Sequence, residues 1–191
     1  MKIIAISNQK GGVGKTTTTV NLAASFVNMK KKVLLIDLDP QGNATSGGGI
    51  NKSQIQHSIY DVLIGDISLN KIILKSEESF FDIAPANQDL AGAEIDLVGI
   101  QDREYMLKNA INALKKSYDY ILIDCPPTLN LLTVNALVAA TAVLIPMQCE
   151  YYALEGLSDL VNTITRVKKQ LNPEIEIEGL LRTLFDKRNT L

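Results

Sequence analysis

The sequence predicts an α/β fold in which a mostly parallel central β-sheet is flanked by helices on both faces. Short apolar runs of strand length alternate with longer stretches of helical period, which is the pattern of βαβ units. The strand runs are continuous in Ile, Val and Leu, as in strands that are covered on both faces. With 191 residues, 46% of them hydrophobic, the chain can bury the core of one such domain.

The first half of the chain opens with a predicted strand, Ile3–Ser7, which is too short for a signal segment and is followed by polar residues. Apolar residues at helical spacing predict a helix at about Thr16–Met29. An uninterrupted apolar run predicts a buried strand at Val33–Asp37. Three glycines at 47–49 indicate a flexible loop, and a helix is expected at about Ile55–Ile64.

The second half repeats this alternation. Strands are expected where short apolar runs occur, at Phe81–Ala84, Tyr120–Asp124, Ala142–Met147 and Ile177–Leu184. Helices are expected between them, at about Arg103–Lys116, Leu131–Thr141 and Leu154–Leu171. Pro173 cannot continue a helix and therefore ends the last one.

Composition excludes several classes of function. The 19 basic and 21 acidic residues give a net charge of −2, which excludes a histone-like protein that binds DNA through bulk charge. His57, Cys125 and Cys149 lack the spacing of zinc, haem or disulfide sites. We expect His57 to be a packing or surface residue and both cysteines to be small buried hydrophobes. The longest apolar run, 136–147, is too short to span a membrane, so a cytoplasmic protein is expected.

The most informative segment lies between the first predicted strand and helix, and it reads KGGVGKTT at residues 10–17. Glycines let the backbone N–H groups approach an oxyanion, and the start of the helix adds the positive end of its dipole. Lys15 is placed to reach the β- and γ-phosphates, Thr16 to offer its hydroxyl to Mg²⁺, and Thr17 to contact the α-phosphate. We therefore predict an ATP site formed by Lys10, Gly11, Gly12, Val13, Gly14, Lys15, Thr16 and Thr17.

Two carboxylates follow the second strand, and a third ends a later one. Asp37 and Asp39 are two residues apart, so alternation along the strand is expected to send both over the phosphate loop. Asp37 suits contact with Mg²⁺ through water, and Asp39 suits orienting or deprotonating the attacking water. Asp124 ends an apolar strand and is expected to serve the metal. The plainer alternatives are a solvated loop carboxylate for Asp39 and a turn residue for Asp124.

Lys10 gives the loop a more specific character. The general phosphate-loop pattern requires glycine where this chain has Gln9, and a lysine just before the glycines is the signature of deviant Walker A ATPases. Together with VLLIDLDPQGN at 33–43, ILIDCPP at 121–127 and QCEYYALEG at 148–156, it makes the chain resemble ParA/Soj-type chromosome- or plasmid-partition ATPases. The resemblance implies a P-loop NTPase fold of the deviant Walker A class.

The resemblance covers essentially all of 1–191 and implies a single ATPase domain. Family members continue for several tens of residues more, so we expect the C-terminal segment of the family to be missing. In the family, that segment contributes to the adenine pocket and to part of the DNA-binding surface. The resemblance also implies the same roles for Asp37 and Asp39. It further implies that Lys10 acts catalytically across an ATP-sandwich homodimer, on the nucleotide of the partner subunit, and more weakly that Glu150 lies at that interface. A solvated surface position remains the alternative for both residues.

The same resemblance implies that the ATP-bound dimer binds double-stranded DNA nonspecifically on the nucleoid, and that a ParB-type centromere-binding protein triggers hydrolysis. The basic clusters are small: Arg166, Lys168 and Lys169 near a helix end, and Lys187 with Arg188 after the last strand. Lysines at a helix C-terminus are favoured by its dipole in any case. Arg188 matches a basic position of the family and is the better candidate for DNA contact.

Three other functions compete with this one. A MinD-like division-site ATPase would bind membrane, but the residues after Asp39 resemble ParA proteins and no membrane partner is expected. An iron–sulfur protein of the nitrogenase-reductase type needs bridging cysteines, and neither Cys125 nor Cys149 has that spacing. A nucleotide-binding module without turnover is the non-enzymatic alternative.

Overall fold

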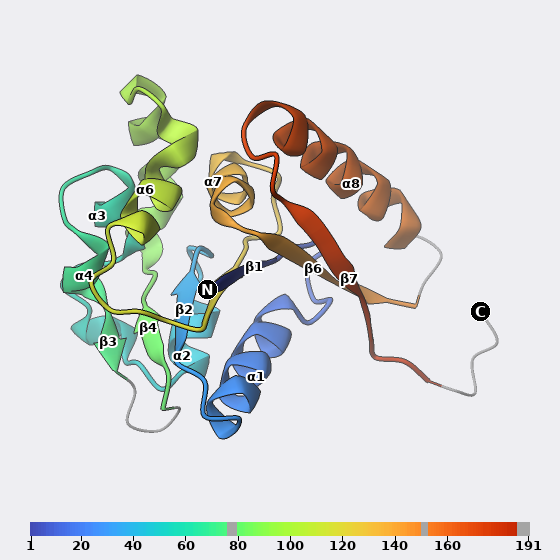
Figure 1. Cartoon of the computed structure of the whole chain (residues 1–191), viewed down its shortest axis with the longest axis horizontal. Helices are drawn as coiled ribbons and strands as arrows, with labels where there is room; N and C mark the ends of the chain where they lie inside the picture. The colour runs from blue at the N-terminus through green and yellow to red at the C-terminus, as the bar shows by residue number, and fades with distance from the viewer. Residues whose placement is uncertain (76–79, 150–152, 187–191) are drawn as a thin grey trace.

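The computed structural model describes residues 1–191 except 76–79, 150–152 and 187–191 (Figure 1). Its centre is a seven-stranded sheet in the order β3-β4-β2-β5-β1-β6-β7. The only antiparallel neighbours among the described strands are β3 and β4. The predicted α/β fold with a mostly parallel sheet is therefore confirmed.

The strands are β1 (Lys2–Ile6), β2 (Val33–Asp37), β3 (Leu74–Lys75), β4 (Asp82–Ala84), β5 (Tyr120–Asp124), β6 (Ala142–Gln148) and β7 (Glu176–Thr183). The helices are α1 (Lys15–Asn28), α2 (Asn43–Gly47), α3 (Ile59–Leu63), α4 (Leu69–Ile72), α5 (Ala93–Asp96), α6 (Met106–Asn112), α7 (Leu131–Ala139) and α8 (Ala153–Gln170). Short 3₁₀ turns lie at Lys52–Gln54, Gln88–Gly92, Leu97–Gly99 and Arg103–Tyr105.

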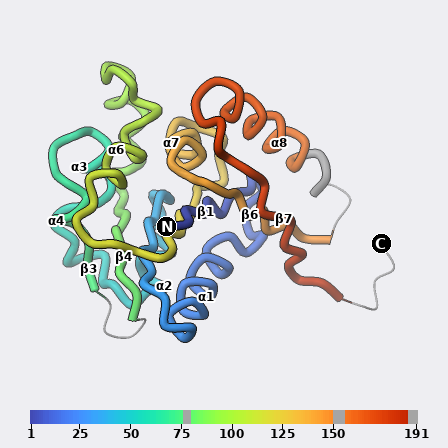
Figure 2. The backbone as a smooth tube through the Cα atoms, viewed as in Figure 1, coloured from blue at the N-terminus to red at the C-terminus, as the bar shows by residue number. Residues whose placement is uncertain are grey.

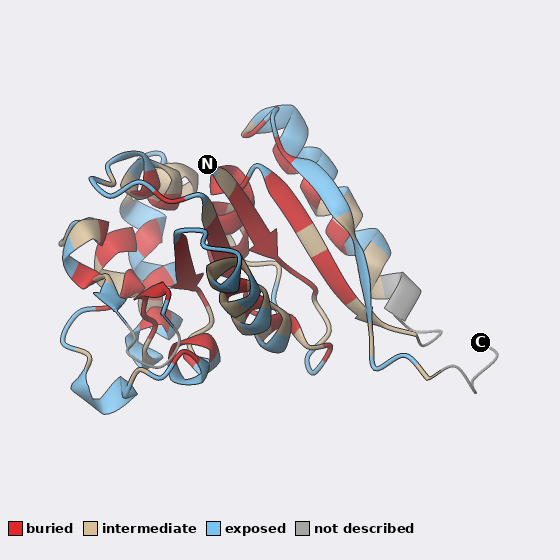
Figure 3. Cartoon of the chain, turned by 60° about the horizontal axis from the view of Figure 1, so that its bottom comes forward, coloured by how far each residue is buried: buried red, intermediate tan, exposed pale blue. Residues whose placement is uncertain are grey.

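Two apolar cores lie on opposite faces of the sheet, because successive strand residues point to opposite sides. Ile3 and Ala5 of β1 belong to the core under α3, α6, α7 and α8. Ile4 and Ile6 belong to the core under α1 and α2. The central strands are almost entirely buried, with only the first residue of β1 and of β5 partly exposed, as Figure 3 shows. Helices on both faces therefore hold these strands, and the loops at their carboxyl ends, in fixed positions.

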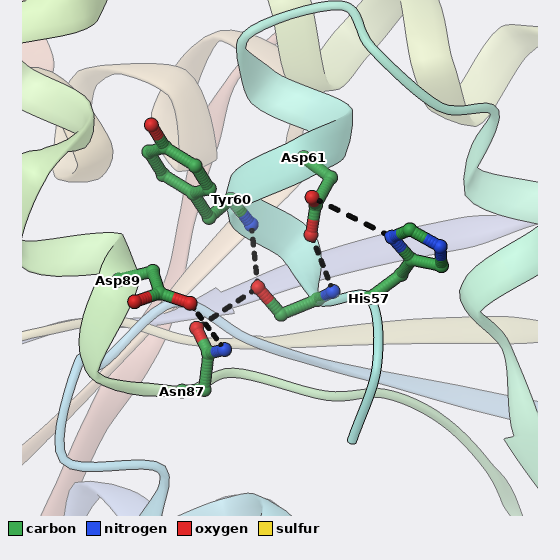
Figure 4. Close-up of polar contacts among 6 residues, drawn as sticks. His57, Tyr60, Asp61, Asn87 and Asp89 are labelled. Carbon is green, nitrogen blue, oxygen red and sulfur yellow. Dashed lines mark hydrogen bonds and ion pairs between the residues drawn. The ribbon is translucent and has the colours of Figure 1, made fainter.

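The helix predicted over Ile55–Ile64 is shorter in the structure. Ser58 begins α3 with a capping box: its hydroxyl accepts from the Tyr60 N–H at 3.2 Å, and Asp61 accepts from the Ser58 N–H at 2.7 Å (Figure 4). Such a cap fixes the start of a helix, so residues 55–57 stay outside it. The helix predicted over Arg103–Lys116 likewise reduces to a 3₁₀ turn and α6.

The loop predicted at 47–49 begins one residue late in the structure, because Gly47 is the last residue of a short helix, α2, and Gly48 and Gly49 form the turn after it. Gly48 caps its C-terminus, and a Cβ atom at this position would approach Ile83 to 2.2 Å. Gly48 thus lets α2 pack directly against β4. Cys125 is buried as predicted, whereas Cys149 is only partly buried.

Strand β7 differs from its prediction as well, because it pairs with β6 alone and forms the edge of the sheet. Ile177 is 44% exposed and Leu180 52%, so the expectation of a strand covered on both faces is wrong here. No helix in the described part of the chain is long and apolar enough to cross a membrane. The tube in Figure 2 shows that the N-terminus leads directly into β1, which later strands enclose on both sides.

Candidate active site

The phosphate loop connects the carboxyl end of β1 to α1. Gly12 and Gly14 adopt left-handed backbone angles, with φ of 72° and 88°, which glycine adopts without strain. Gly14 is also the N-cap of α1, and it has no side chain to satisfy the first N–H groups of the helix. A Cβ atom at Gly11 or Gly12 would meet nothing within 4 Å. These N–H groups therefore border open space, as an anion-binding loop requires.

Neighbouring strands hold the loop in place. The Asn8 amide donates to the Pro146 carbonyl at 2.7 Å, and its oxygen accepts from the Lys10 N–H at 3.0 Å. Gln148 donates to the Gly12 carbonyl at 3.1 Å, and Thr183 to the Val13 carbonyl at 2.8 Å. Side chains from the ends of β6 and β7 thus fix a loop whose glycines would otherwise be free to move.

Lys15 lies at the base of the loop and is only 7% exposed. Its ammonium group donates to the Lys10 carbonyl at 3.2 Å, so Lys10 takes part in the loop through its backbone. Burial lowers the pKa of Lys15, and the negative charge of Asp124 partly counteracts this. A buried lysine among backbone dipoles is ready to bind an anion such as a phosphate.

Asp124 ends β5 and is fully buried beneath α1. It accepts hydrogen bonds from the Thr16 hydroxyl at 2.7 Å and from the Thr19 hydroxyl at 3.0 Å. Burial, followed by the nearby charge of Asp37, raises the pKa of Asp124 to about 7, while the two hydroxyls oppose this rise. Thr19 was not predicted from the sequence, although its position three residues after Thr16 on a helix places it on the same face.

Asp37 and Asp39 have different surroundings, so alternation along the strand does not give them equivalent positions. Asp37 is fully buried beside Asp124, in register on the neighbouring strand. Its carboxylate accepts from the Thr45 N–H at 2.8 Å, the Thr45 hydroxyl at 2.7 Å and the Asp39 N–H at 3.1 Å. Burial raises the pKa of Asp37 to about 6 despite these hydrogen bonds.

Asp39 belongs to a cavity of about 340 Å³ around the phosphate loop, whose lining comes from three segments of chain. They contribute Gly11, Gly12, Gly14, Lys15, Thr16, Thr17, Asp39, Asn43 and Pro127. The structure thus brings together Asp39 and six of the eight predicted phosphate-binding residues, whereas Lys10 and Val13 do not line this cavity and Val13 is buried. It also adds Asn43 and Pro127, which the sequence did not single out because only the folded chain places them here. Arg188, Lys187 and Glu150 lie outside the described residues.

The donor set at this cavity suits a cation that is held jointly with phosphate. Among the described residues, no three His, Cys, Asp or Glu side chains gather to hold a metal alone. Mg²⁺ is commonly bound by one or two carboxylates together with substrate phosphates and water. Thr16 and Asp124, hydrogen-bonded to each other beside the loop, fit that requirement.

Comparison with known proteins places these features in a family. The family model described as "AAA domain" matches residues 1–177. The chain is 56% identical to the sporulation initiation inhibitor protein Soj of Bacillus subtilis, over all of this chain and 75% of that protein. A crystal structure of a plasmid partition protein from Borrelia burgdorferi is 35% identical and has a TM-score of 0.83, with 98% of this chain and 80% of that one covered.

A further solved structure has a nucleotide bound. It is titled cobyrinic acid a,c-diamide synthase from Mycobacterium smegmatis with bound ADP and magnesium. It is 41% identical to this chain, with a TM-score of 0.95, and the match covers 100% of this chain and 77% of that one.

Proposed function

The chain belongs to the ParA/Soj family of partition ATPases, and on that premise we propose that it binds ATP with Mg²⁺ and hydrolyses it in a cycle of dimerisation and DNA binding. One observation carries the proposal. Lys15, Thr16 and Asp39 line the same cavity as the glycines of the phosphate loop. The cavity therefore offers a lysine to bind a phosphate group, a hydroxyl to bind a cation and a carboxylate to orient the attacking water.

ATP binds with its phosphates in the loop. The backbone N–H groups of residues 10–17 and the first turn of α1 surround the phosphate oxygens, and Lys15 contacts the β- and γ-phosphates. Thr17, which lines the cavity, contacts the α-phosphate. The Mycobacterium smegmatis structure with ADP and magnesium supports this assignment, because the match to it covers all of this chain.

Thr16 and Asp124 hold Mg²⁺, which when bound draws charge from the phosphate oxygens. We place Asp37 behind these two residues, because its carboxylate accepts from Thr45 and from the Asp39 N–H, whereas Asp124 accepts from Thr16, which lines the cavity. Asp39 orients the attacking water and accepts its proton. Its partial exposure in the cavity supports this role, since the water must reach it from the solvent.

Lys10 completes the site across a homodimer. Its carbonyl accepts from the Lys15 ammonium group, so the Lys10 backbone and the Lys15 side chain are linked within one loop. We propose that the Lys10 side chain reaches the nucleotide of the partner subunit and offsets the charge that develops on the transferred phosphoryl group. The ATP-bound dimer then binds double-stranded DNA nonspecifically on the nucleoid in the cytoplasm. A ParB-type protein stimulates hydrolysis and returns the protein to monomers.

Calorimetric titration with ATP and Mg²⁺ tests the first step. Lys15→Ala should abolish most binding, because loss of a charge-assisted contact in a desolvated loop costs about 2–5 kcal/mol. Lys31→Ala, an exposed lysine beyond the end of α1, is the matched control and should bind as the parent does. Unchanged ATP affinity in Lys15→Ala contradicts the proposed site.

Two further measurements separate the alternatives. Phosphate release distinguishes an ATPase from a nucleotide-binding module, which would bind ATP without turnover. Sedimentation with liposomes and with DNA distinguishes a MinD-like protein, whose ATP form follows the liposomes, from a partition ATPase, whose ATP form follows the DNA.

A further inference from the structure

Thr45 is a buried residue of α2 that does not line the cavity around the phosphate loop. It is fully enclosed, and its hydroxyl uses both of its hydrogen-bonding capacities. The hydroxyl donates to Asp37 Oδ2 at 2.7 Å and accepts from the Ala86 N–H at 3.0 Å. Its own N–H donates to the same Asp37 oxygen at 2.8 Å. Thr45 thus joins three segments of the chain at one point.

The Asp37 carboxylate in turn closes the segment between residues 39 and 45. One of its oxygens accepts from the Asp39 N–H at 3.1 Å, and the other is held by Thr45. Within this loop the Gln41 N–H donates to Asp39 Oδ1 at 2.9 Å. Both ends of the segment that carries Asp39 are therefore attached to one buried carboxylate.

The loop has little freedom to take another shape. Gly42 has a left-handed φ of 61°, and a Cβ atom there would lie 2.8 Å from the Lys52 side chain and 3.0 Å from the Ala86 carbonyl oxygen. Its N–H donates to the Asp39 carbonyl at 2.8 Å. The segment therefore packs directly onto the backbone at Ala86.

Ala86 is itself well anchored. On one side of it, the Pro85 carbonyl accepts from the Ile59 N–H at 2.8 Å. On the other, the Asn87 side-chain oxygen accepts from the Ser58 hydroxyl at 3.0 Å, within the network of Figure 4 that also contains the α3 capping box. The Thr45 hydroxyl therefore accepts from an N–H group in a stretch of backbone that hydrogen bonds to Ser58 and Ile59 hold in place.

We propose that Thr45 is a positioning residue for ATP hydrolysis: its hydroxyl, acting through Asp37, fixes the loop that presents Asp39 to the phosphate cavity. The inference rests on the proposed function, since it assigns Asp39 to the attacking water. Thr45 contacts neither nucleotide nor cation, so its loss changes the chemical step and leaves ATP binding in place. A displacement of about 1 Å at a catalytic group can lower a rate by about 100-fold.

Hydrolysis kinetics of three variants test this. Thr45→Val removes the hydroxyl at nearly constant volume, Thr45→Ser keeps it, and Thr141→Val is the control, at an exposed threonine whose hydroxyl makes a similar pair of hydrogen bonds. The Thr141 hydroxyl donates to the Ile3 carbonyl and accepts from the Ile3 N–H, both at 3.0 Å. Thr141 directly precedes β6, so it lies at the amino ends of the strands, whereas the phosphate loop lies at their carboxyl ends. Thr45→Val should lower kcat about 10- to 100-fold with KM within about threefold. Thr45→Ser and Thr141→Val should keep kcat within about threefold of the parent.

Amide hydrogen exchange in the nucleotide-free protein provides a readout independent of turnover. The Asp39 and Gln41 amides, which this network holds, should exchange at least about tenfold faster in Thr45→Val than in Thr141→Val. If valine prevents folding, Thr45→Ala makes the same comparison. Parent-like kcat and exchange in Thr45→Val, or a Thr45→Ser variant as slow as Thr45→Val, overturns the inference. A parent protein that does not hydrolyse ATP contradicts the proposed function instead, and the exchange comparison then decides the role of Thr45.

Discussion

The Thr19 hydroxyl, one helical turn beyond Thr16, shares its proton between Asp124 Oδ1 at 3.0 Å and the Lys15 carbonyl at 2.9 Å, and the Thr16 hydroxyl donates to Asp124 Oδ2 at 2.7 Å. Both oxygens of this buried carboxylate are therefore held from the same face of α1. When Thr16 turns toward a cation, Thr19 still orients the carboxylate. We therefore expect Thr19 to affect metal binding without contacting the metal.

Thr19→Val should accordingly weaken Mg²⁺-dependent ATP binding. Loss of a residue that orients a metal ligand typically costs about 10- to 100-fold in affinity. The free energy of unfolding should also fall by about 1–3 kcal/mol, because a buried acceptor loses its partner. Calorimetry at several Mg²⁺ concentrations and denaturant unfolding measure the two effects. Thr18→Val, on the same helix, is the control, and a parent-like Mg²⁺ dependence in Thr19→Val contradicts the role.

Replacement of Asp39 should separate hydrolysis from binding. Asp39→Asn keeps the oxygen that accepts from the Gln41 N–H but cannot take a proton, so hydrolysis should fall by about 10²–10⁴. ATP and Mg²⁺ should still bind, since Lys15, Thr16 and Asp124 are unchanged. Gel filtration with ATP should show the variant accumulating as a dimer, beside a phosphate-release assay that shows the loss of turnover.

Lys10→Ala is the informative comparison for that experiment. If Lys10 acts across the dimer, this variant should bind ATP and yet remain monomeric and slow. Asp39→Asn that hydrolyses ATP at the parent rate, or that stays monomeric with ATP bound, shows that Asp39 has only a structural role.

DNA binding should require ATP and fall steeply with salt, because a chain of net charge −2 cannot hold a duplex through bulk charge. Arg188→Ala should weaken binding to all sequences alike and reduce the salt slope by about one. Lys31→Ala, an exposed lysine that belongs to neither basic cluster, is the control for a general loss of positive charge. Fluorescence titrations of the ATP-bound protein with unrelated duplexes measure this. A strong preference for one sequence, or tight binding without nucleotide, is the contrary result.

Stability at high pH should depend on Tyr118. This buried residue donates to Asp82 at 2.6 Å, and burial, reinforced by that hydrogen bond, raises the pKa of Tyr118 above its ordinary value of 10.0. The folded state therefore keeps a proton that the unfolded state loses above about pH 10, so the stability present below that pH declines as the pH rises further. Tyr118→Phe should reduce the decline in the free energy of unfolding, measured with urea between pH 9 and about 11.5. Tyr60→Phe is the control and should keep more of this decline.

Much of the fold follows from the sequence, because buried parallel strands are continuous apolar runs. The bounds of β2 and β5 agree with those predicted from the sequence. The errors lie where a local interaction or the position in the sheet decides. The Ser58 capping box shortens α3, and the exposure of β7 depends on its place at the edge, which no local pattern reveals.

The candidate site shows the same division. The phosphate loop is one contiguous segment, so its residues and their spacing are visible in the sequence. Helical spacing alone could have predicted that Thr19 lies on the same face as Thr16. Asn43 and Pro127 become neighbours of the loop only through tertiary structure. The role of Thr45 could not be predicted from the sequence, because it depends on hydrogen bonds to Asp37 and to Ala86, which is 41 residues away.

The place of β1 in the sheet has a consequence for biosynthesis. It is synthesised before the other described strands of the sheet, and yet its neighbours are β5 and β6, whose registers with it begin at Tyr120 and Ala142. Contacts between residues so far apart in sequence form slowly, because a long loop must close first. At about 5–20 residues per second, translation takes on the order of ten seconds to deliver β5. The nascent chain therefore exposes an unpaired Ile-rich strand throughout this time, and the proposed nucleotide site, which Pro127 helps to line, can form only after β5 has been synthesised.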